Sequence, residues 1–374
     1  MKKTLLFINL LISLLLFIIS YAYVDQTLIS IISPSLPRIL NLIPLVKLVA
    51  HYRHPFAFLW LLCLSLIFIS QIIFLLNQKA LKYTKITLIT IFLTCLFLAL
   101  SFPYLSKDIF TYIYSGRMIL VFHQNPYQVT PNQLASQDIW VNLCHWVDRP
   151  YAYGPTMLFL NTLLMVILNP NRIIDNFYAV KILNLILFIY TGYLFSRKNK
   201  KQTLALWFYN PLLLIELLQN SHNDLIMISL FVFSFTFKFK NKILKYIIFV
   251  SSVLAKYFSF IFLPLLLFPR QKIIKLFFFL ALFVIYFKGT HAWYYTWAYM
   301  IIPFAQLKKT TLLLLFTHHF LLLIKNYLPF LLFAAWTNYQ PLNIIRFLLP
   351  ITLLTVVFWE FINLQEILNK HTHG

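Results

Sequence analysis

The amino-acid sequence predicts an all-α fold, a polytopic bundle of about 10 to 13 membrane helices with one sizeable loop. Hydrophobic residues make up 61% of the 374 residues and charged residues only 11%, whereas soluble domains have roughly 25% charged residues. Apolar runs of membrane-span length fill almost the whole chain, and Lys and Arg gather in short clusters between them. Together these observations indicate a chain that crosses a membrane repeatedly.

The net charge of +22 comes from 31 Lys and Arg against 9 Asp and Glu. In a soluble protein this excess would suggest nucleic acid as a partner. Here the cations follow the positive-inside pattern, which assigns their loops to the cytoplasm, so we expect a lipid bilayer and no nucleic acid. The clusters are Lys2-Lys3, Lys79/Lys82/Lys85, Arg197-Lys198/Lys200-Lys201, Lys238/Lys240/Lys242/Lys245, Arg270/Lys272/Lys275 and Lys308-Lys309.

The first apolar run, Thr4–Tyr23, follows two lysines and ends in a small-x-small pattern, as a signal peptide does. It is longer than the usual signal core of about 7–15 residues, so we expect an uncleaved first helix. The other predicted spans, in chain order, are Phe56–Leu76, Ile86–Phe102, Phe177–Phe195, Thr203–Leu218, Leu225–Phe237, Leu276–Phe287, Tyr294–Leu307, Thr310–Ile324, Tyr327–Trp336 and Ile344–Ile362.

Two stretches do not fit as simple spans. Pro155–Leu168 is short for a crossing, and counting it as one would place the Arg197–Lys201 cluster outside. We therefore expect a juxtamembrane or re-entrant helix there. Tyr246–Phe268 has basic clusters at both ends and Lys256 in its middle, so we expect a broken or re-entrant pair of helices.

These choices predict one integral membrane domain over residues 1–374. It has an external loop with juxtamembrane helices at 103–154, a central helix bundle at 155–307 and C-terminal helices at 308–374. The loop and the turns at Asn220–Asp224 and Lys288–Trp293 then lie on the external side, opposite the basic loops. Long ordered loops are usually functional, so we expect the polar chemistry on this face.

The external loop supplies the first candidate residues, Asp108 and Tyr112, which share one face of a predicted helix. Asp108 can simply complement the positive end of the helix dipole. Alternatively it is a general base at the membrane boundary, where low polarity would raise its pKa. Arg117 falls about half a turn away and joins the same site only if Gly116 ends the helix.

The second candidate segment lies between two apolar runs and contains Glu216 and the triplet His222, Asn223 and Asp224. One of the triplet can cap the following helix, but three polar residues in a row exceed what capping needs. Glu216 falls within the membrane, where an unpaired carboxylate is costly, so we favour a functional role. His-x-Asp alone lacks the three or four ligands of a metal site, and we predict none.

Two further candidates have strong structural explanations. Lys256 can extend to the membrane surface as a long cation, or it can neutralise a phosphate in a cavity. Trp293 and Tyr294 lie in an aromatic turn that would ordinarily anchor the protein at the membrane interface. Stacking of one of these rings on a sugar is the functional alternative.

In this order the segments resemble bacterial and archaeal polyprenyl-phosphate-dependent mannosyltransferases of the GT-C glycosyltransferase superfamily, over roughly Phe102 to Pro303. Lys107, Phe110 and Ile113 depart from the common family choices. The matching motifs are Ser106-Lys-Asp108 with Tyr112, Gly116-Arg117 and Asn125-Pro126-Tyr127; Tyr153-Gly154-Pro155; Asn210-Pro211 with Glu216 and His222-Asn223-Asp224; Lys256 with Pro264; and Trp293-Tyr294 with Trp297.

This resemblance implies a GT-C-like fold in the cell membrane. The implied enzyme transfers a sugar, mannose in this family, from a polyprenyl-phosphate donor to a hydroxyl of a glycan or glycolipid acceptor. Transfer would invert the anomeric centre, without a cofactor or metal, on the external face. Asp108 matches the family's general base, and Arg117, His222 and Lys256 would stabilise the departing lipid phosphate. The other expected substrate-binding residues are Tyr112, Glu216, Asn223, Asp224, Trp293 and Tyr294.

The main alternative is a membrane transporter or lipid flippase. Transporters more often carry inverted repeats with interrupted helices in matching positions. Here the polar motifs are unevenly placed and cluster on one face, which disfavours transport. A structural membrane protein whose polar turns only cap helices is a third interpretation. Glucose, galactose and arabinose donors also stay open beside mannose.

Overall fold

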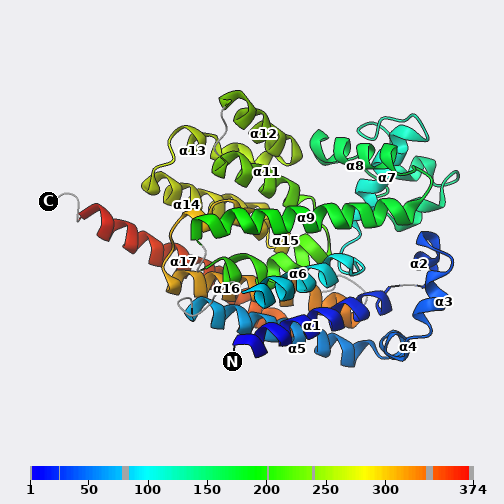
Figure 1. Ribbon diagram of the computed structural model, residues 1–374, viewed down its shortest axis with the longest axis horizontal. Helices are drawn as coiled ribbons and strands as arrows, with labels where there is room; N and C mark the ends of the chain where they lie inside the picture. Colours follow the sequence, from blue (N-terminus) through cyan, green and yellow to red (C-terminus); the bar gives the residue numbers. More distant parts are fainter. Residues whose placement is uncertain are drawn as a thin grey trace. The chain divides into compact units, whose positions relative to one another are not determined.

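The computed structural model describes residues 2–24, 26–77, 84–199, 202–237, 241–333 and 340–369 (Figure 1). Every regular element in these ranges is helical, which confirms the predicted all-α class. Parts of three predicted basic loops, at 78–83, 200–201 and 238–240, lie outside the described residues, as does Trp336 at the end of a predicted span.

The chain divides into two compact units, each assembled from three separate stretches of sequence. Unit 1 comprises Met1–Phe56, Lys82–Leu194 and Leu214–Ser259, and unit 2 comprises Ala57–Leu81, Phe195–Leu213 and Phe260–Gly374. Two of the five boundaries between them fall inside long helices, α5 (Arg53–Leu76) and α9 (Ile173–Asn199).

Five helices in the described part of the chain are long and apolar enough to cross a membrane, and they identify a membrane protein. They are Lys3–Ala22, His54–Leu76, Ile173–Lys198, Lys309–Phe333 and Gln340–Ile362. Four shorter apolar helices are Lys85–Leu100, Pro155–Ile167, Asp224–Thr236 and Tyr257–Leu267. The larger number of crossings expected from the sequence stays a prediction.

Unit 1 begins with an apolar helix and contains the long loop between residues 103 and 154. Besides most of α9, its helices are α1 (Lys2–Ala22), α2 (Gln26–Ile32), α3 (Leu36–Leu40), α4 (Pro44–His51), α6 (Lys85–Leu100), α7 (Asp108–Leu120), η2 (Pro131–Leu134), η3 (Ile139–Leu143), α8 (Pro155–Ile167), η5 (Leu214–Gln219), α11 (Asp224–Thr236) and α12 (Lys242–Ala255). The short 3-10 helix η6 (Tyr257–Phe262) follows α12 and contains the end of unit 1.

Helices α1 and α6 lie side by side, and so do α11 and α12 (Figure 1). At the end of α6, the Tyr21 hydroxyl donates to the Leu100 carbonyl at 2.8 Å. The Phe102 backbone N–H in turn donates to Ser20 Oγ at 2.8 Å. Because both bonds are buried or partly buried, they fix the point at which the long loop leaves the helices.

Of the two stretches that do not fit as simple spans, Pro155–Leu168 forms a short helix and Tyr246–Phe268 is broken. Pro155–Leu168 contains the single helix α8, whose 13 residues are too few to cross a bilayer. Tyr246–Phe268 is broken as predicted, because α12 ends at Ala255 and the backbone becomes extended at Lys256, with φ −150° and ψ 129°. The short helices η6 and α13 (Leu263–Leu267) follow this break.

Unit 2 contains long helices joined by short helical turns. Besides most of α5, its elements are η4 (Leu204–Phe208), α10 (Pro211–Leu213), α13, α14 (Gln271–Lys288), α15 (Ala292–Tyr295), η7 (Thr296–Met300), η8 (Ile302–Phe304), α16 (Lys309–Phe333), η9 (Gln340–Leu342) and α17 (Asn343–Asn369). Helices α16 and α17 pack along each other.

Two spans predicted in continuous apolar runs are wrong. Thr203–Leu218 contains η4, α10 and η5, and it is broken between η4 and α10 because Pro211 has no backbone N–H to continue a helix. Asn210 Oδ1 instead accepts the Leu212 N–H at 3.0 Å and starts a new turn. Tyr294–Leu307 consists of α15, η7 and η8, with Pro303 at the start of the last.

A third correction joins two predicted spans. Thr310–Ile324 and the described part of Tyr327–Trp336 belong to the continuous helix α16. The polar pair Lys325 and Asn326 suggested a turn, but Lys325 reaches Thr290 with its side chain while its backbone stays helical. A polar side chain that finds a partner does not require the helix to end.

Candidate active site

A polar cluster in unit 1 unites parts of the chain that are far apart in the sequence. It forms where the start of α7, the end of the long loop, the turn between η5 and α11, and the end of α12 meet. Seven residues singled out from the sequence belong to it, namely Asp108, Tyr112, Glu216, His222, Asn223, Asp224 and Lys256.

Asp108 is the first residue of α7, and its carboxylate is partly open, with 17% of the side chain exposed. Trp146 Nε1 donates to Oδ1 at 3.1 Å, and the Tyr153 hydroxyl donates to Oδ2 at 3.1 Å. Both donors come from the end of the long loop. The loop therefore holds the carboxylate in one orientation without covering it completely.

His222 lies between two carboxylates. Its Nδ1 is 3.5 Å from Asp108 Oδ2, and its Nε2 is 3.3 Å from Glu216 Oε2. Glu216 Oε2 also accepts from Asn220 Nδ2 at 3.2 Å. The side chains of His222 and Glu216 are 2% and 0% exposed. A ring with a carboxylate near each nitrogen is most stable as the imidazolium, which donates from both.

The pKa values of these groups follow from their contacts. Burial lowers the pKa of His222, but hydrogen bonds to Asp108 and Glu216 outweigh burial and raise it to about 10. Burial raises the pKa of Asp108, but His222, the charge of Lys256 and the Tyr153 hydrogen bond outweigh burial and lower it. The expected upward shift at Asp108 is therefore wrong. The carboxylate is ionised at neutral pH.

Lys256 does not simply extend to a membrane surface. Its Nζ is 2.7 Å from Asp224 Oδ1, and 16% of its side chain is exposed, whereas Asp224 is fully buried. Nζ also lies 5.7 Å from the centre of the Tyr153 ring. The end of α12 thus places a partly open cation close to the Asp108 carboxylate.

The turn that carries His222 depends on an irregular backbone. The π-helical turn η5 ends at Gln219, and Ser221, two residues later, has a φ of 57°, in the left-handed region that non-glycine residues rarely adopt. The buried Lys181 donates to the carbonyls of Leu218 and Gln219 at 3.3 and 2.6 Å. The Leu218 carbonyl also accepts from the Ser221 hydroxyl at 3.0 Å. Carbonyls at the end of a helix have no partner within the helix, and these side chains supply one. Lys181 therefore supports the turn from α9.

Tyr112 supports the site from the side of α7. Its hydroxyl donates to Asn223 Oδ1 at 3.4 Å, and its ring meets the Tyr153 ring edge to face at 4.9 Å. Tyr112 and Asn223 are both buried. These two predicted site residues therefore connect α7 to the His222 turn, and they form the wall of the site behind Asp108.

The structure does not bring Arg117 to Asp108. Helix α7 continues through Gly116 to Leu120, so Arg117 lies about 13 Å further along the helix axis. Its Nε is 2.6 Å from Asp138 Oδ2, and its guanidinium lies 4.1 Å from the centre of the Trp140 ring. Arg117 therefore fastens the long loop to α7, and the expected contact with a lipid phosphate is not available in this arrangement.

Trp293 and Tyr294 belong to unit 2, in the short helix α15. The Trp293 ring stacks on His291 with 4.4 Å between ring centres, and Tyr294 meets the Trp297 ring at 5.0 Å. The aromatic turn is thus a packed cluster of its own. Contact of these rings with a sugar stays a prediction.

Two residues of the site were not predicted, Trp146 and Tyr153. Tyr153 belongs to the motif Tyr153-Gly154-Pro155 of the family resemblance but is not among the expected site residues, although it directly precedes Gly154 and Pro155, a pair that usually marks a special backbone path. Nothing in the sequence around Trp146 distinguishes it from an interfacial ring. The position of both depends on how the long loop folds back onto α7.

Gly154 allows the loop to approach α12 closely. A Cβ at this position would lie 1.8 Å from the Leu254 carbonyl oxygen, so part of the backbone would have to move. We expect Gly154→Ala to lower the free energy of unfolding by about 1–3 kcal/mol and to reduce turnover, because Tyr153 would shift away from Asp108. Thermal unfolding and kcat measure the two effects.

Gly116→Ala is a matched control for this substitution. Its Cβ would meet Met165 Sδ at 3.0 Å, the flexible part of a side chain that can move aside. A smaller loss of stability with unchanged turnover is expected. Equal effects of the two substitutions would contradict the role given to Gly154.

The arrangement combines an ionised carboxylate, neutral donors that orient it, and nearby cations. Such a site can accept a proton from a hydroxyl and stabilise a negative charge that develops beside it. Within the described ranges, no group of three or more His, Cys, Asp or Glu side chains could hold a metal ion.

The fold and the cluster together define a helical membrane protein with a cluster of charged and polar side chains in unit 1. The model of a family described as alpha-(1→6)-mannopyranosyltransferase, N-terminal domain, matches residues 23–269, more than half of the chain. The chain belongs to this family, and it is therefore a glycosyltransferase, specifically a mannosyltransferase. No curated protein and no solved structure matches the chain.

The matched range contains every residue of the polar cluster, including Trp146 and Tyr153. The resemblance found in the sequence is thereby confirmed at the level of the family. Membership also favours the transferase over the transporter or flippase interpretation. The aromatic turn with Trp293 and Tyr294 lies outside the matched range.

Proposed function

We propose that this enzyme transfers mannose from a polyprenyl-phosphate donor to a hydroxyl of a glycan or glycolipid acceptor, with inversion, on the external face of the cell membrane. The observation that carries the proposal is the state of Asp108. It is ionised, partly exposed and oriented by two hydrogen-bond donors beside His222 and Lys256. A general base for a hydroxyl acceptor needs these properties.

In the proposed step, the acceptor oxygen attacks the anomeric carbon of mannose while Asp108 takes the hydroxyl proton. The bond between the anomeric carbon and the phosphate oxygen breaks, and its electron pair leaves with the lipid phosphate. A lowered pKa keeps Asp108 deprotonated before the reaction. The acceptor hydroxyl becomes much more acidic as its oxygen bonds to carbon, so a carboxylate is a sufficient base at that point.

Lys256 is the best-placed cation to stabilise the departing phosphate. Arg117 is bound to Asp138, and both ring nitrogens of His222 face carboxylates. The side chain of Lys256 is partly open and close enough to lower the pKa of Asp108. The charge that develops on the leaving group would therefore be stabilised from α12.

Inversion also determines the anomeric configuration of the sugar donor. The family name specifies an α-(1→6) linkage, and a single displacement that inverts the anomeric carbon gives an α product only from a β-linked donor. If this chain makes the same linkage, the acceptor group is the primary hydroxyl on carbon 6. Such a primary hydroxyl projects from the sugar ring.

The distribution of charge along α12 supports an external location for the site. This helix starts at Lys242, within a basic cluster, and ends at Ala255, just before Lys256 in the site. Its 14 residues separate the two ends by about 20 Å. Since basic loops stay in the cytoplasm, the end that carries the site points away from it.

The test is a transfer assay with purified enzyme in vesicles and three donors: β-linked polyprenyl-phosphate mannose, its α-linked anomer, and GDP-mannose. We expect transfer only from the β-linked lipid, with an α linkage in the product by NMR. Transfer from GDP-mannose at a comparable rate would overturn the lipid donor. An α product from the α-linked donor would overturn inversion.

A further inference from the structure

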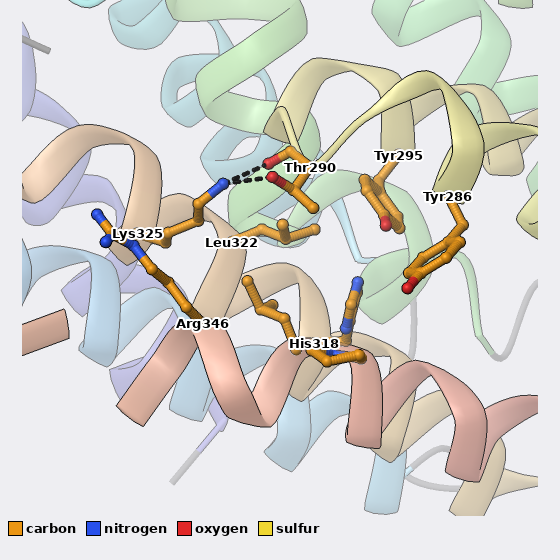
Figure 2. Close-up of a pocket in the computed structure, with 9 residues that line it drawn as sticks. Tyr286, Thr290, Tyr295, His318, Leu322, Lys325 and Arg346 are labelled. Carbon is orange, nitrogen blue, oxygen red and sulfur yellow. Dashed lines mark hydrogen bonds between the residues drawn. The ribbon is translucent and has the colours of Figure 1, made fainter. Parts of the chain in front are cut away.

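Unit 2 contains a pocket of about 470 Å³ that the proposed reaction does not use. It is formed by α14, the turn after it, α15, α16 and α17 (Figure 2). Its polar lining residues are Tyr286, Thr290, Tyr295, His318, Lys325 and Arg346. None of the nine described residues that line the pocket is Asp or Glu.

The pocket lies at one end of the unit 2 helices. At the other end, Lys275 of α14 is 3.3 Å from Glu360 of α17, and Thr311 of α16 donates to the same carboxylate. Lys325 lies about 21 Å from Thr311 along α16, and Arg346 lies about 21 Å from Glu360 along α17. The pocket is thus opposite the basic cluster that contains Lys275, which the positive-inside rule assigns to the cytoplasm.

Two cations in this pocket have donors available for a ligand. Lys325 Nζ donates to the carbonyl and the hydroxyl of Thr290 (Figure 2). Arg346 Nη1 donates to Asn343 Oδ1 at 3.1 Å. A guanidinium carries five N–H donors, so this bond leaves most of its donors over. Among the described residues, no carboxylate forms an ion pair with either cation.

The charge balance of unit 2 explains why neither Lys325 nor Arg346 forms an ion pair with a described carboxylate. Its three stretches contain only two acidic residues, Glu360 and Glu366. Glu360 already binds Lys275, at the other end of the helices from Arg346. Cations without counter-ions within membrane helices are costly and mark binding sites by default. The missing negative charge is therefore expected to come from a ligand.

A second, independent observation points to a ligand. His318 lines the pocket and is only 1% exposed. Its Nδ1 bonds to Thr352 Oγ1 at 2.8 Å, while its Nε2 is buried without a hydrogen-bond partner in the described part of the protein. A buried polar atom of this kind is destabilising unless something binds it. In Figure 2 the His318 ring points towards the space between Tyr286 and Leu322.

We propose that this pocket binds the phosphate group of an anionic lipid. Arg binds phosphate through two parallel hydrogen bonds, and Lys adds a point charge. The hydroxyl groups of Tyr286, Thr290 and Tyr295 are further donors. The volume exceeds what a bare ion needs and lies in the range of small-ligand sites.

The surface beside Arg346 favours a lipid over free phosphate. On α17, the side chains of Ile344, Phe347 and Ile351 are 66%, 68% and 42% exposed. They are spaced three to four residues apart, so they form one apolar stripe that begins next to Arg346. Acyl or prenyl chains can lie on such a stripe while the phosphate enters the pocket. A lipid and free phosphate present the same phosphate chemistry to the pocket, and only the lipid carries an apolar tail.

The test uses the full-length purified protein and native mass spectrometry after incubation with vesicles of phosphatidylcholine that contain phosphatidic acid. Wild type is expected to retain phosphatidic acid in preference to phosphatidylcholine. Lys325→Gln and Arg346→Gln should each weaken retention about tenfold, as expected for loss of a charge-assisted hydrogen bond. Lys272→Gln removes an exposed cation of α14 outside the pocket, and it should retain the lipid as wild type does.

Competition with inorganic phosphate distinguishes the two sources. Displacement of phosphatidic acid by millimolar inorganic phosphate would assign the pocket to free phosphate, and resistance to displacement would assign it to the lipid; both support a phosphate site. No preference of wild type for phosphatidic acid would overturn the proposal without any variant. Equal losses in Lys272→Gln and in the two pocket variants would also overturn it.

Folding is checked separately from binding. Lys325→Arg keeps the charge and should retain most of the lipid. Arg346→Lys keeps the charge but loses the paired hydrogen bonds, so it should retain less lipid than wild type and more than Arg346→Gln. Both should have an unchanged melting temperature. If the two Gln variants unfold, these conservative variants and the wild-type lipid preference still decide the question. The experiment does not measure sugar transfer, so its outcome is independent of the function proposed for the unit 1 site.

Discussion

Asp108→Asn is expected to lower kcat by about 10²- to 10⁴-fold, the usual contribution of a general base. Asparagine has nearly the same shape and still accepts hydrogen bonds from Trp146 and Tyr153. It cannot take a proton from the acceptor hydroxyl. Initial rates at saturating donor and acceptor measure the effect, and the KM of the donor should change much less, because Asp108 acts on the acceptor.

A matched control separates catalysis from folding. Asp148 lies in the same loop, outside the cluster, and accepts a hydrogen bond from Asn132 at 2.9 Å. Asp148→Asn is expected to leave kcat within about twofold of wild type, because exposed polar contacts contribute little. If Asp108→Asn is folded and keeps kcat within tenfold of wild type, Asp108 is not the general base.

His222→Gln is the second substitution with a large expected effect. It leaves the carboxylates of Asp108 and Glu216 without the cation they share. Removing one partner of a buried ionic contact costs about 3–5 kcal/mol. We expect a loss of this order in the free energy of unfolding. Turnover should fall as well, because Asp108 would lose the contact that holds its pKa down.

The double substitution Glu216→Gln/His222→Gln tests whether an uncompensated buried charge causes the loss of stability in His222→Gln. With the buried carboxylate of Glu216 also neutralised, most of the lost stability should return. Recovery in the double variant would identify the uncompensated charge as the source of the loss. A double variant that is as unstable as the sum of the two single variants would contradict the shared ionic contact.

The same contact predicts how stability depends on pH. The pKa of His222 is raised from 6.5 in the unfolded chain to about 10 in the folded protein. Its contribution is therefore complete below pH 6.5 and is lost as the pH rises through about 10. Melting temperatures of wild type should fall across this window, and those of His222→Gln should fall less. Parallel curves would contradict the assignment.

Much of the fold could be predicted because hydropathy reports which segments avoid water. The first helix, the short helix α8 and the break at Lys256 all follow from run length and charge. Hydropathy does not report whether the backbone continues as one helix. Tyr294–Leu307 is apolar enough for a span, yet it consists of short helical turns. In contrast, α16 continues as one helix through the polar residues Lys325 and Asn326.

The candidate site was predictable where polar residues interrupt apolar runs, since such residues are rare and costly near a membrane. Asp108, His222 and Lys256 were found in this way. Trp146 and Tyr153 could not be, because aromatic residues are common at any membrane boundary. Arg117 was assigned to the wrong partner, because its true partner, Asp138, lies in a loop whose path local sequence does not specify.

The sequence by itself determined that this protein lies in a membrane, its all-α class and its family. Composition, the spacing of charges and short motifs can be read from neighbouring residues along the chain. Only the tertiary structure decided the electrostatics of the site. Glu216, His222 and Asp108 come from two distant segments, and the pKa of Asp108 is lowered because those segments meet. A pKa depends on distances through space, and these are set by packing.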